Sequence, residues 1–142
     1  MTQRELDDVD PEECLRLLGT LHVGRLVYVD DDGPAAVPVN YSMAGRDIVL
    51  RVEGGAKRAA MAQPVVGFEV DHVDEATHAG WSVLLRGQGS EIALDDVPAL
   101  IREAQGRIPA PWATGIHSVW LRIVPSIITG KRLGEARSTP PL

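Results

Sequence analysis

The sequence predicts a small, mostly antiparallel β-barrel of about six strands with a few short helices. Short runs of apolar and β-branched residues recur along the 142 residues, and Gly, Pro or Asp turns separate them. Few segments carry the caps and spacing of a helix. We find no internal repeat, linker or low-complexity segment, so residues 1–142 are expected to form one domain, with residues 1–9 and 133–142 as loose tails.

The first elements are marked by a helix cap and by alternating apolar residues. Asp10 has the features of an N-cap, and a short helix is predicted over Pro11–Leu18. Strands are predicted over residues 23–29 and 36–43. Pro38 lies inside the second strand. Because proline cannot donate to a ladder, this position should be an edge, a bulge or a place where the backbone opens toward a ligand.

Four further strands complete the predicted barrel, at residues 47–52, 65–70, 81–92 and 117–128. Two short helices are expected between them, over residues 58–63 and 98–105. Gly87 and Gly89 fall inside the longest of these strands and predict a bulge or a bend. The acidic residues 71–76 are expected to form a loop.

Composition and charge argue against several classes of protein. Fourteen Lys and Arg against twenty Asp and Glu give a net charge of −6, and no basic stripe favours nucleic-acid binding. No apolar run approaches the roughly 18 residues of a membrane span. The polar, acidic start resembles neither a signal peptide nor a transit peptide, so a cytoplasmic protein is expected. Cys14 is the single cysteine, and we expect it to pack in the core.

The chain contains no recognisable catalytic constellation. Its four histidines have no metal-ligand spacing, and it lacks a G-x-S-x-G turn, a Rossmann glycine turn and a nucleotide-phosphate loop. No metal is therefore expected, and the sequence assigns no catalytic residue.

One stretch, RVEGGAKRAAM, points to a ligand. It places Arg51, Lys57 and Arg58 around Gly54 and Gly55, at the junction of a predicted strand and a helical segment. Free amides at such a turn, together with the positive end of a helix, favour an anion. Arginine can donate to two phosphate oxygens, and lysine acts as a point charge. The alternative is a solvated strand end with ordinary surface charges.

Four stretches together resemble the pyridoxamine 5′-phosphate oxidase-like flavin proteins, in the nitroimidazole-resistance and flavin reductase-like branch. They are VGRLVYVDDDGPAAVPVNYSM, IVLRVEGGAKRAAM, VVGFEVDHVDEATHAGWSVLLRGQG and IVPSIITGKRL, in the family's order and spacing. The resemblance covers about residues 11–132. It implies a six-stranded split β-barrel domain that binds FMN, and a homodimer with the cofactor in a groove between the subunits.

The resemblance also implies roles for particular positions. The backbone at Pro38, Val39 and Asn40 would lie along the flavin ring, and Trp81 and Ser82 would reach it from the opposite subunit. Asn40 and Trp81 have alternatives, as a sheet hydrogen-bonding residue and a packing residue. The phosphate would be held by Arg51, Gly55, Ala56 and Lys57. Many relatives have Ser or Thr in place of Ala56, so a charged hydrogen bond of roughly 1.5–3 kcal/mol is missing here.

The function implied by the resemblance is that of a flavin-dependent oxidoreductase that reduces a small oxidised compound, such as a quinone or a nitroaromatic. In such enzymes the cofactor carries the chemistry, so no acid–base constellation is required. Two alternatives remain. The first is a reductase that uses the deazaflavin F420, bound through a broader basic groove. The second is a non-enzymatic carrier or sensor that binds flavin or haem.

Overall fold

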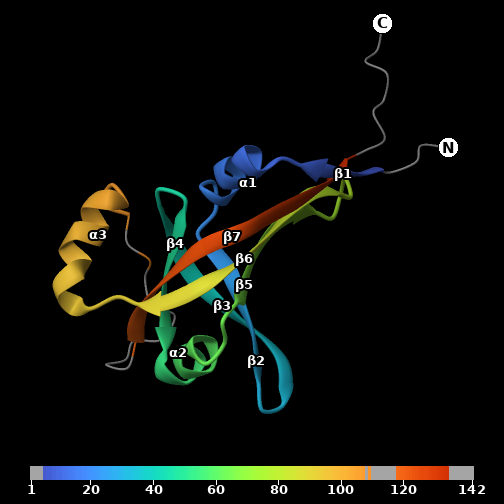
Figure 1. Ribbon diagram of the computed structural model, residues 1–142. Coiled ribbons are helices and arrows are strands. Elements are labelled where there is room, and N and C mark those ends of the chain that lie inside the picture. Colours follow the sequence, from blue (N-terminus) through green and yellow to red (C-terminus); the bar gives the residue numbers. More distant parts are fainter. Residues whose placement is uncertain (1–4, 108, 110–117, 135–142) are drawn as a thin grey trace, which may run out of the picture.

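The computed structural model describes residues 5–107, 109 and 118–134. Within this part of the chain, strands and short helices follow one another in the order shown in Figure 1. They are β1 (Glu5–Val9), α1 (Pro11–Leu18), β2 (Val23–Asp30), β3 (Gly33–Ala44), β4 (Asp47–Glu53), α2 (Gly54–Met61), β5 (Val66–Asp74), β6 (Ala79–Glu91), the 3-10 helix η1 (Leu94–Asp96), α3 (Val97–Glu103) and β7 (Ser118–Gly134).

Six of the strands form a closed antiparallel ring. The sheet order is β1-β7-β4-β3-β2-β5-β6, and an additional pairing of β7 with β6 closes it. β1 lies outside the ring, on an edge of β7. The predicted fold class, a mainly β protein with six antiparallel strands in a split-barrel-like arrangement and a few short helices, is confirmed.

The long strand β7 holds the ring together. Its 17 residues pair with β4 at one end, with β6 along most of its length and with β1 at the other end. Residues 5–9 and 133–134 are therefore paired strand residues, and the expectation that they belong to loose tails is wrong. The sequence of β1, ELDDV, lacks the apolar alternation that predicts a strand. Backbone pairing with β7 holds this segment in the sheet. Residues 135–142 lie outside the described part.

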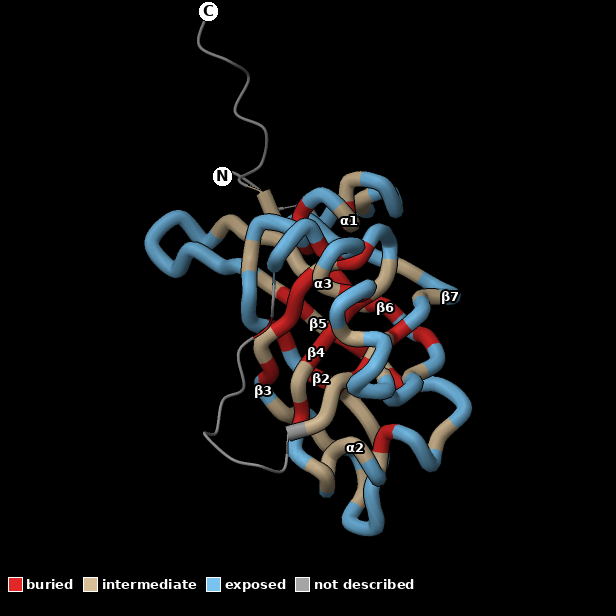
Figure 2. Tube along the Cα trace, turned by 90° about the vertical axis from the view of Figure 1, so that its left-hand side faces the viewer, coloured by how far each residue is buried: buried red, intermediate tan, exposed pale blue. Residues whose placement is uncertain are grey.

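The core fills the inside of the ring, where alternate residues of each strand point. Figure 2 shows these buried positions on the central strands. The Tyr41 and Phe68 rings meet edge to face, with centroids 5.1 Å apart. The Tyr41 hydroxyl donates to the backbone carbonyl of Leu18, which attaches α1 to the core. Burial raises the pKa of Tyr41 well above its ordinary value.

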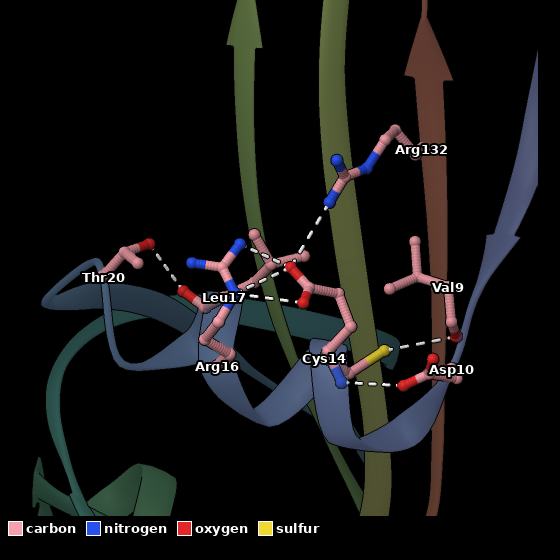
Figure 3. Close-up of polar contacts among 8 residues, drawn as sticks. Val9, Asp10, Cys14, Arg16, Leu17, Thr20 and Arg132 are labelled. Carbon is pink, nitrogen blue, oxygen red and sulfur yellow. Dashed lines mark hydrogen bonds and ion pairs between the residues drawn. The ribbon is translucent and has the colours of Figure 1, made fainter.

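The predicted helix over Pro11–Leu18 is confirmed as α1, together with its cap. The Asp10 carboxylate accepts a hydrogen bond from the Glu13 amide at 2.8 Å. Figure 3 shows the Cys14 sulfur directed at the Val9 carbonyl, 3.5 Å away. Cys14 is fully buried, and burial raises the pKa of its thiol. A Cβ at Gly130 would lie 2.5 Å from this sulfur, so a glycine there lets α1 approach β7.

Helix α2 begins earlier than predicted, at Gly54 instead of residue 58. Glycine costs about 1 kcal/mol relative to alanine in a helix, which is why the sequence favoured a turn here. Burial outweighs this cost, since Ala56 and Ala60 pack on the core at one end of the ring. In Figures 1 and 2, α1 and α2 lie at opposite ends of the strands.

Helix α3 lies outside the ring and covers a second, smaller core. Leu100 and Ala104 pack there with Ala44 and Val49, and Trp120 contacts the same cluster. Arg122 of β7 donates to Asp47 at 2.7 Å and to Glu103 at 2.7 Å. This pairing lowers the pKa of Glu103 and ties α3 to the sheet. None of the helices in the described residues has the length and apolarity to span a bilayer.

Two details of the sheet test the sequence prediction, one confirming it and one correcting it. The register between β6 and β7 shifts at Arg86 and Gly87, which confirms the predicted bulge. Residues 71–74 were expected in a loop but form the end of β5, paired with the start of β6. The acidic side chains of this segment favour a loop in the sequence, but backbone hydrogen bonds hold it in the sheet as a strand.

Three charged side chains form a cluster on the outer face of the ring, where β2 meets β5. Arg25 donates from one nitrogen to Glu69 at 2.9 Å and to Asp71 at 3.3 Å. Burial raises the pKa of Glu69 from 4.5 to about 7, with further contributions from a hydrogen bond with Asp71 and from its charge; Arg25 opposes the shift. Glu69 therefore titrates near neutral pH in the folded protein.

We expect Glu69 to make the protein less stable as the pH rises from about 4.5 to 7. Its pKa is higher in the folded than in the unfolded state, so its contribution is complete below pH 4.5 and is lost as the pH rises through 7. Partial exposure limits the effect to about 1 kcal/mol. Urea unfolding at pH 5 and pH 8 measures it. Glu69→Gln should reduce the difference between the two pH values by this amount, and an unchanged difference would contradict the assignment.

Candidate functional site

The candidate anion seat lies where β4 passes directly into α2. The N-cap residue Glu53 makes no side-chain hydrogen bond to the amides of the first helical turn. A Cβ built on Gly54 or Gly55 would meet no other atom within 4 Å. The start of α2 therefore offers amides that an anion can approach closely, at the positive end of the helix dipole.

Arg51 lies two residues before this turn and faces the outside of the ring. Its guanidinium carbon is 5.0 Å from the centroid of the Trp120 ring, and the two residues are partners in the β4–β7 register. The Nε atom of Arg51 is buried. A cation–π contact of this kind fixes the guanidinium at the edge of the seat.

Lys57 is in the first turn of α2 and is half-buried. Its Nζ lies 2.9 Å from Oε2 of Glu91, the last residue of β6. Glu91 is the register partner of Leu121, which follows Trp120 in the sequence. Arg51 and Lys57 therefore reach the same end of β7, one from β4 and the other from α2. Sequence reasoning missed Glu91, because the neighbouring residues in the sequence do not indicate that it contacts a residue distant in the chain.

The segment of β3 around Pro38 has an open edge next to this seat. β3 pairs with β2 over residues 33–40 but with β4 only over residues 41–44. Pro38 therefore lies on an unpaired edge of β3, which is one of the three alternatives expected for this position. Extending the register by one residue from the Tyr41–Leu50 pair puts Asn40 level with Arg51. Val39 is buried, so only its backbone is available to a ligand.

Two of the predicted site residues lie elsewhere in the same chain. Trp81 and Ser82 are near the start of β6 and pair with Arg132 and Lys131 of β7. Ten residues separate Trp81 from Glu91 along this strand, which corresponds to about 33 Å. Within one chain, Trp81 and Ser82 thus do not join Arg51 and Lys57, and Trp81 packs against the core.

The other charged candidates contribute less to this site. Arg58 is exposed on α2, and Arg46 pairs with Glu12 at 2.7 Å. His22, His72 and His78 are exposed, and His117 lies outside the described residues. In the described part of the chain, no group of three or more His, Cys, Asp or Glu is placed to hold a metal ion.

A cavity of about 360 Å³ opens at the opposite end of β4, where the strand begins. It is lined by Pro11, Arg46, Asp47 and residues of β7 between Val124 and Ile128. None of the predicted site residues lines it, so it is separate from the anion seat.

The residues at the α2 seat fit a phosphate. Open amides, a guanidinium and an ammonium are the donors that phosphate oxygens prefer. Ala56 offers no hydroxyl to them and is half-buried against the core. The arrangement can hold the phosphate of a small ligand whose remainder extends along the open edge of β3.

Comparison with known proteins gives consistent matches over most of the chain. The family model described as pyridoxamine 5′-phosphate oxidase matches residues 10–132. The uncharacterised protein Rv0080 of Mycobacterium tuberculosis is 31% identical to this chain in an alignment 143 residues long. The alignment covers 96% of this chain and 91% of that protein.

Solved structures share the fold. The FAD binding protein from Mycobacterium smegmatis is 31% identical, with a TM-score of 0.73, and the match covers 90% of this chain and 98% of that chain. A candidate 5-nitroimidazole antibiotic resistance protein from Bacteroides thetaiotaomicron has a TM-score of 0.74 at 14% identity, over 95% of this chain and 92% of that chain. At this low identity, the second match shows the fold alone.

Proposed function

We propose a function from one premise: the chain belongs to the pyridoxamine 5′-phosphate oxidase family. In this proposal the protein binds a flavin, with FMN as the cofactor, and acts in the cytoplasm as an oxidoreductase that reduces a small oxidised compound. The observation that carries the proposal is the seat at the start of α2, where Arg51 and Lys57 flank open glycine amides. The 31% identical relative described as FAD-binding supports a flavin.

A bound flavin would supply hydride and electron transfer, which is the chemistry that the side chains of the site lack. The protein's part is to bind and orient it. Arg51, Lys57 and the amides of Gly55 and Ala56 would hold the phosphate. The open edge at Pro38 and Asn40 would offer backbone groups to the ring.

We further propose that the site is completed by a second copy of the chain. Trp81 and Ser82 lie too far along β6 to reach the α2 seat of their own chain, and a homodimer would bring them from the partner subunit.

A visible absorption spectrum of the purified protein, followed by titration with FMN and with F420, tests the proposal. We expect flavin absorption bands or tight uptake of FMN, and release of FMN when dilution dissociates the dimer. Rapid bleaching by NAD(P)H, with turnover of a quinone or nitroaromatic, supports an enzyme. Bound flavin that no donor bleaches would indicate a carrier. Uptake of F420 or haem alone, or of none of these ligands, would contradict the FMN proposal.

A further inference from the structure

The ion pair between Lys57 and Glu91 places a carboxylate inside the proposed phosphate seat. The two charged atoms are 2.9 Å apart, and their side chains are 30% and 44% exposed. The backbone on both sides of this contact is fixed. Glu91 pairs with Leu121, and the amide of the next residue, Ile92, donates to the Trp120 carbonyl at 2.9 Å. The sheet therefore holds the backbone of Glu91 beside the seat, and the ion pair with Lys57 directs its carboxylate into it.

A phosphate that binds Lys57 must share the ammonium with Glu91 or displace its carboxylate. Sharing brings the phosphate close to a negative charge, and displacement breaks the ion pair, so either one lowers the affinity for the phosphate. The repulsion grows in proportion to the ligand's own charge. A phosphate monoester, as in FMN, carries between about −1.5 and −2 at neutral pH, whereas riboflavin has no phosphate and no such charge.

We propose that Glu91 is a specificity-determining residue of the cofactor site. It lowers the affinity for a flavin that carries a phosphate and leaves the affinity for a flavin without phosphate unaffected. The inference rests on the proposed flavin function and concerns how the same seat ranks its ligands. Ala56 offers no hydroxyl to a phosphate, so Ala56 and Glu91 together limit the affinity of the seat for phosphate.

The variant Glu91→Gln tests this directly, because glutamine keeps the shape and removes the charge. Affinities for FMN and riboflavin are measured by quenching of flavin fluorescence. We expect the variant to bind FMN about tenfold more tightly. Riboflavin affinity should change by less than about twofold, since riboflavin carries no phosphate.

Asp95→Asn is the control. Asp95 is exposed in η1, four residues after Glu91 and outside the seat, and its replacement removes the same charge, so FMN affinity should change by less than about threefold through the solvent. An effect equal to that of Glu91→Gln would overturn the inference. So would an unchanged FMN affinity in Glu91→Gln, or an equal change for riboflavin, while the flavin function itself would stand.

A second measurement keeps the inference testable if no flavin binds at all, in which case the proposed function fails. Inorganic phosphate is titrated while thermal unfolding is followed. Ligands that bind the folded state raise the unfolding temperature, and we expect phosphate to raise it more in Glu91→Gln than in the unmodified protein. Equal rises in both would overturn the role of Glu91.

Discussion

Replacing Arg51 and Lys57 together by alanine should weaken FMN binding by at least about a hundredfold. Each residue would donate charged hydrogen bonds to the phosphate, worth roughly 1.5–3 kcal/mol apiece. Their joint loss corresponds to roughly a hundredfold to ten-thousandfold in the dissociation constant. The amides at Gly54 and Gly55 remain in the variant, so some affinity for the phosphate should persist. Titration of the purified variant with FMN, followed by fluorescence quenching, measures the loss.

Arg58→Ala is the matched control for this experiment. Arg58 is on the same helix and carries the same charge, but it is exposed. Its replacement should change FMN affinity by no more than about threefold, which is the long-range effect of one solvated charge. Arg51→Ala also removes the cation over Trp120, a contact worth about 0.5–1 kcal/mol, so unfolding curves should show a small loss of stability with the fold intact. A double variant that binds FMN as tightly as the unmodified protein would disprove the phosphate seat.

Most of the fold could be predicted because its signals are local. Asp10 and Pro11 mark α1, and the alternation of apolar residues marks the strands of the ring. The features that the sequence did not reveal depend on partners distant in the chain. β1 has three acidic residues among five and is a strand only because β7 extends far enough to pair with it. Local strand propensity does not indicate that such a pairing partner exists.

The site shows the same division. Arg51, Lys57 and the glycines between them could be recognised as an anion seat from residue types alone, and the structure gathers them with the open edge of β3. The predicted start of α2 was too late in the chain, because the low helix propensity of two glycines received more weight than the burial of Ala56 and Ala60. Glu91 could not be predicted at all, since the 34 positions that separate it from Lys57 carry no sign of their contact.

The second large effect concerns the core that holds the site in place. Phe68 is fully buried at the centre of β5, and its ring meets that of Tyr41 at 5.1 Å. A Cβ at Gly24 would lie 2.5 Å from the tip of the Phe68 ring, so the ring also rests on the backbone of β2. Phe68→Ala leaves a cavity among β2, β3 and β5, and we expect it to lower the free energy of unfolding by about 3–5 kcal/mol.

Urea unfolding without flavin measures this loss, because a bound cofactor would add its own stabilisation. Val73→Ala is the matched control: Val73 is on the same strand but 58% exposed, so its replacement should change the stability by no more than about 0.5 kcal/mol. Phe68 lies inside the core and does not border the seat. Phe68→Ala should therefore reduce FMN binding only by lowering the folded fraction, whereas loss of Arg51 and Lys57 should reduce it in fully folded protein. A Phe68→Ala variant with unchanged stability would contradict the packing described here.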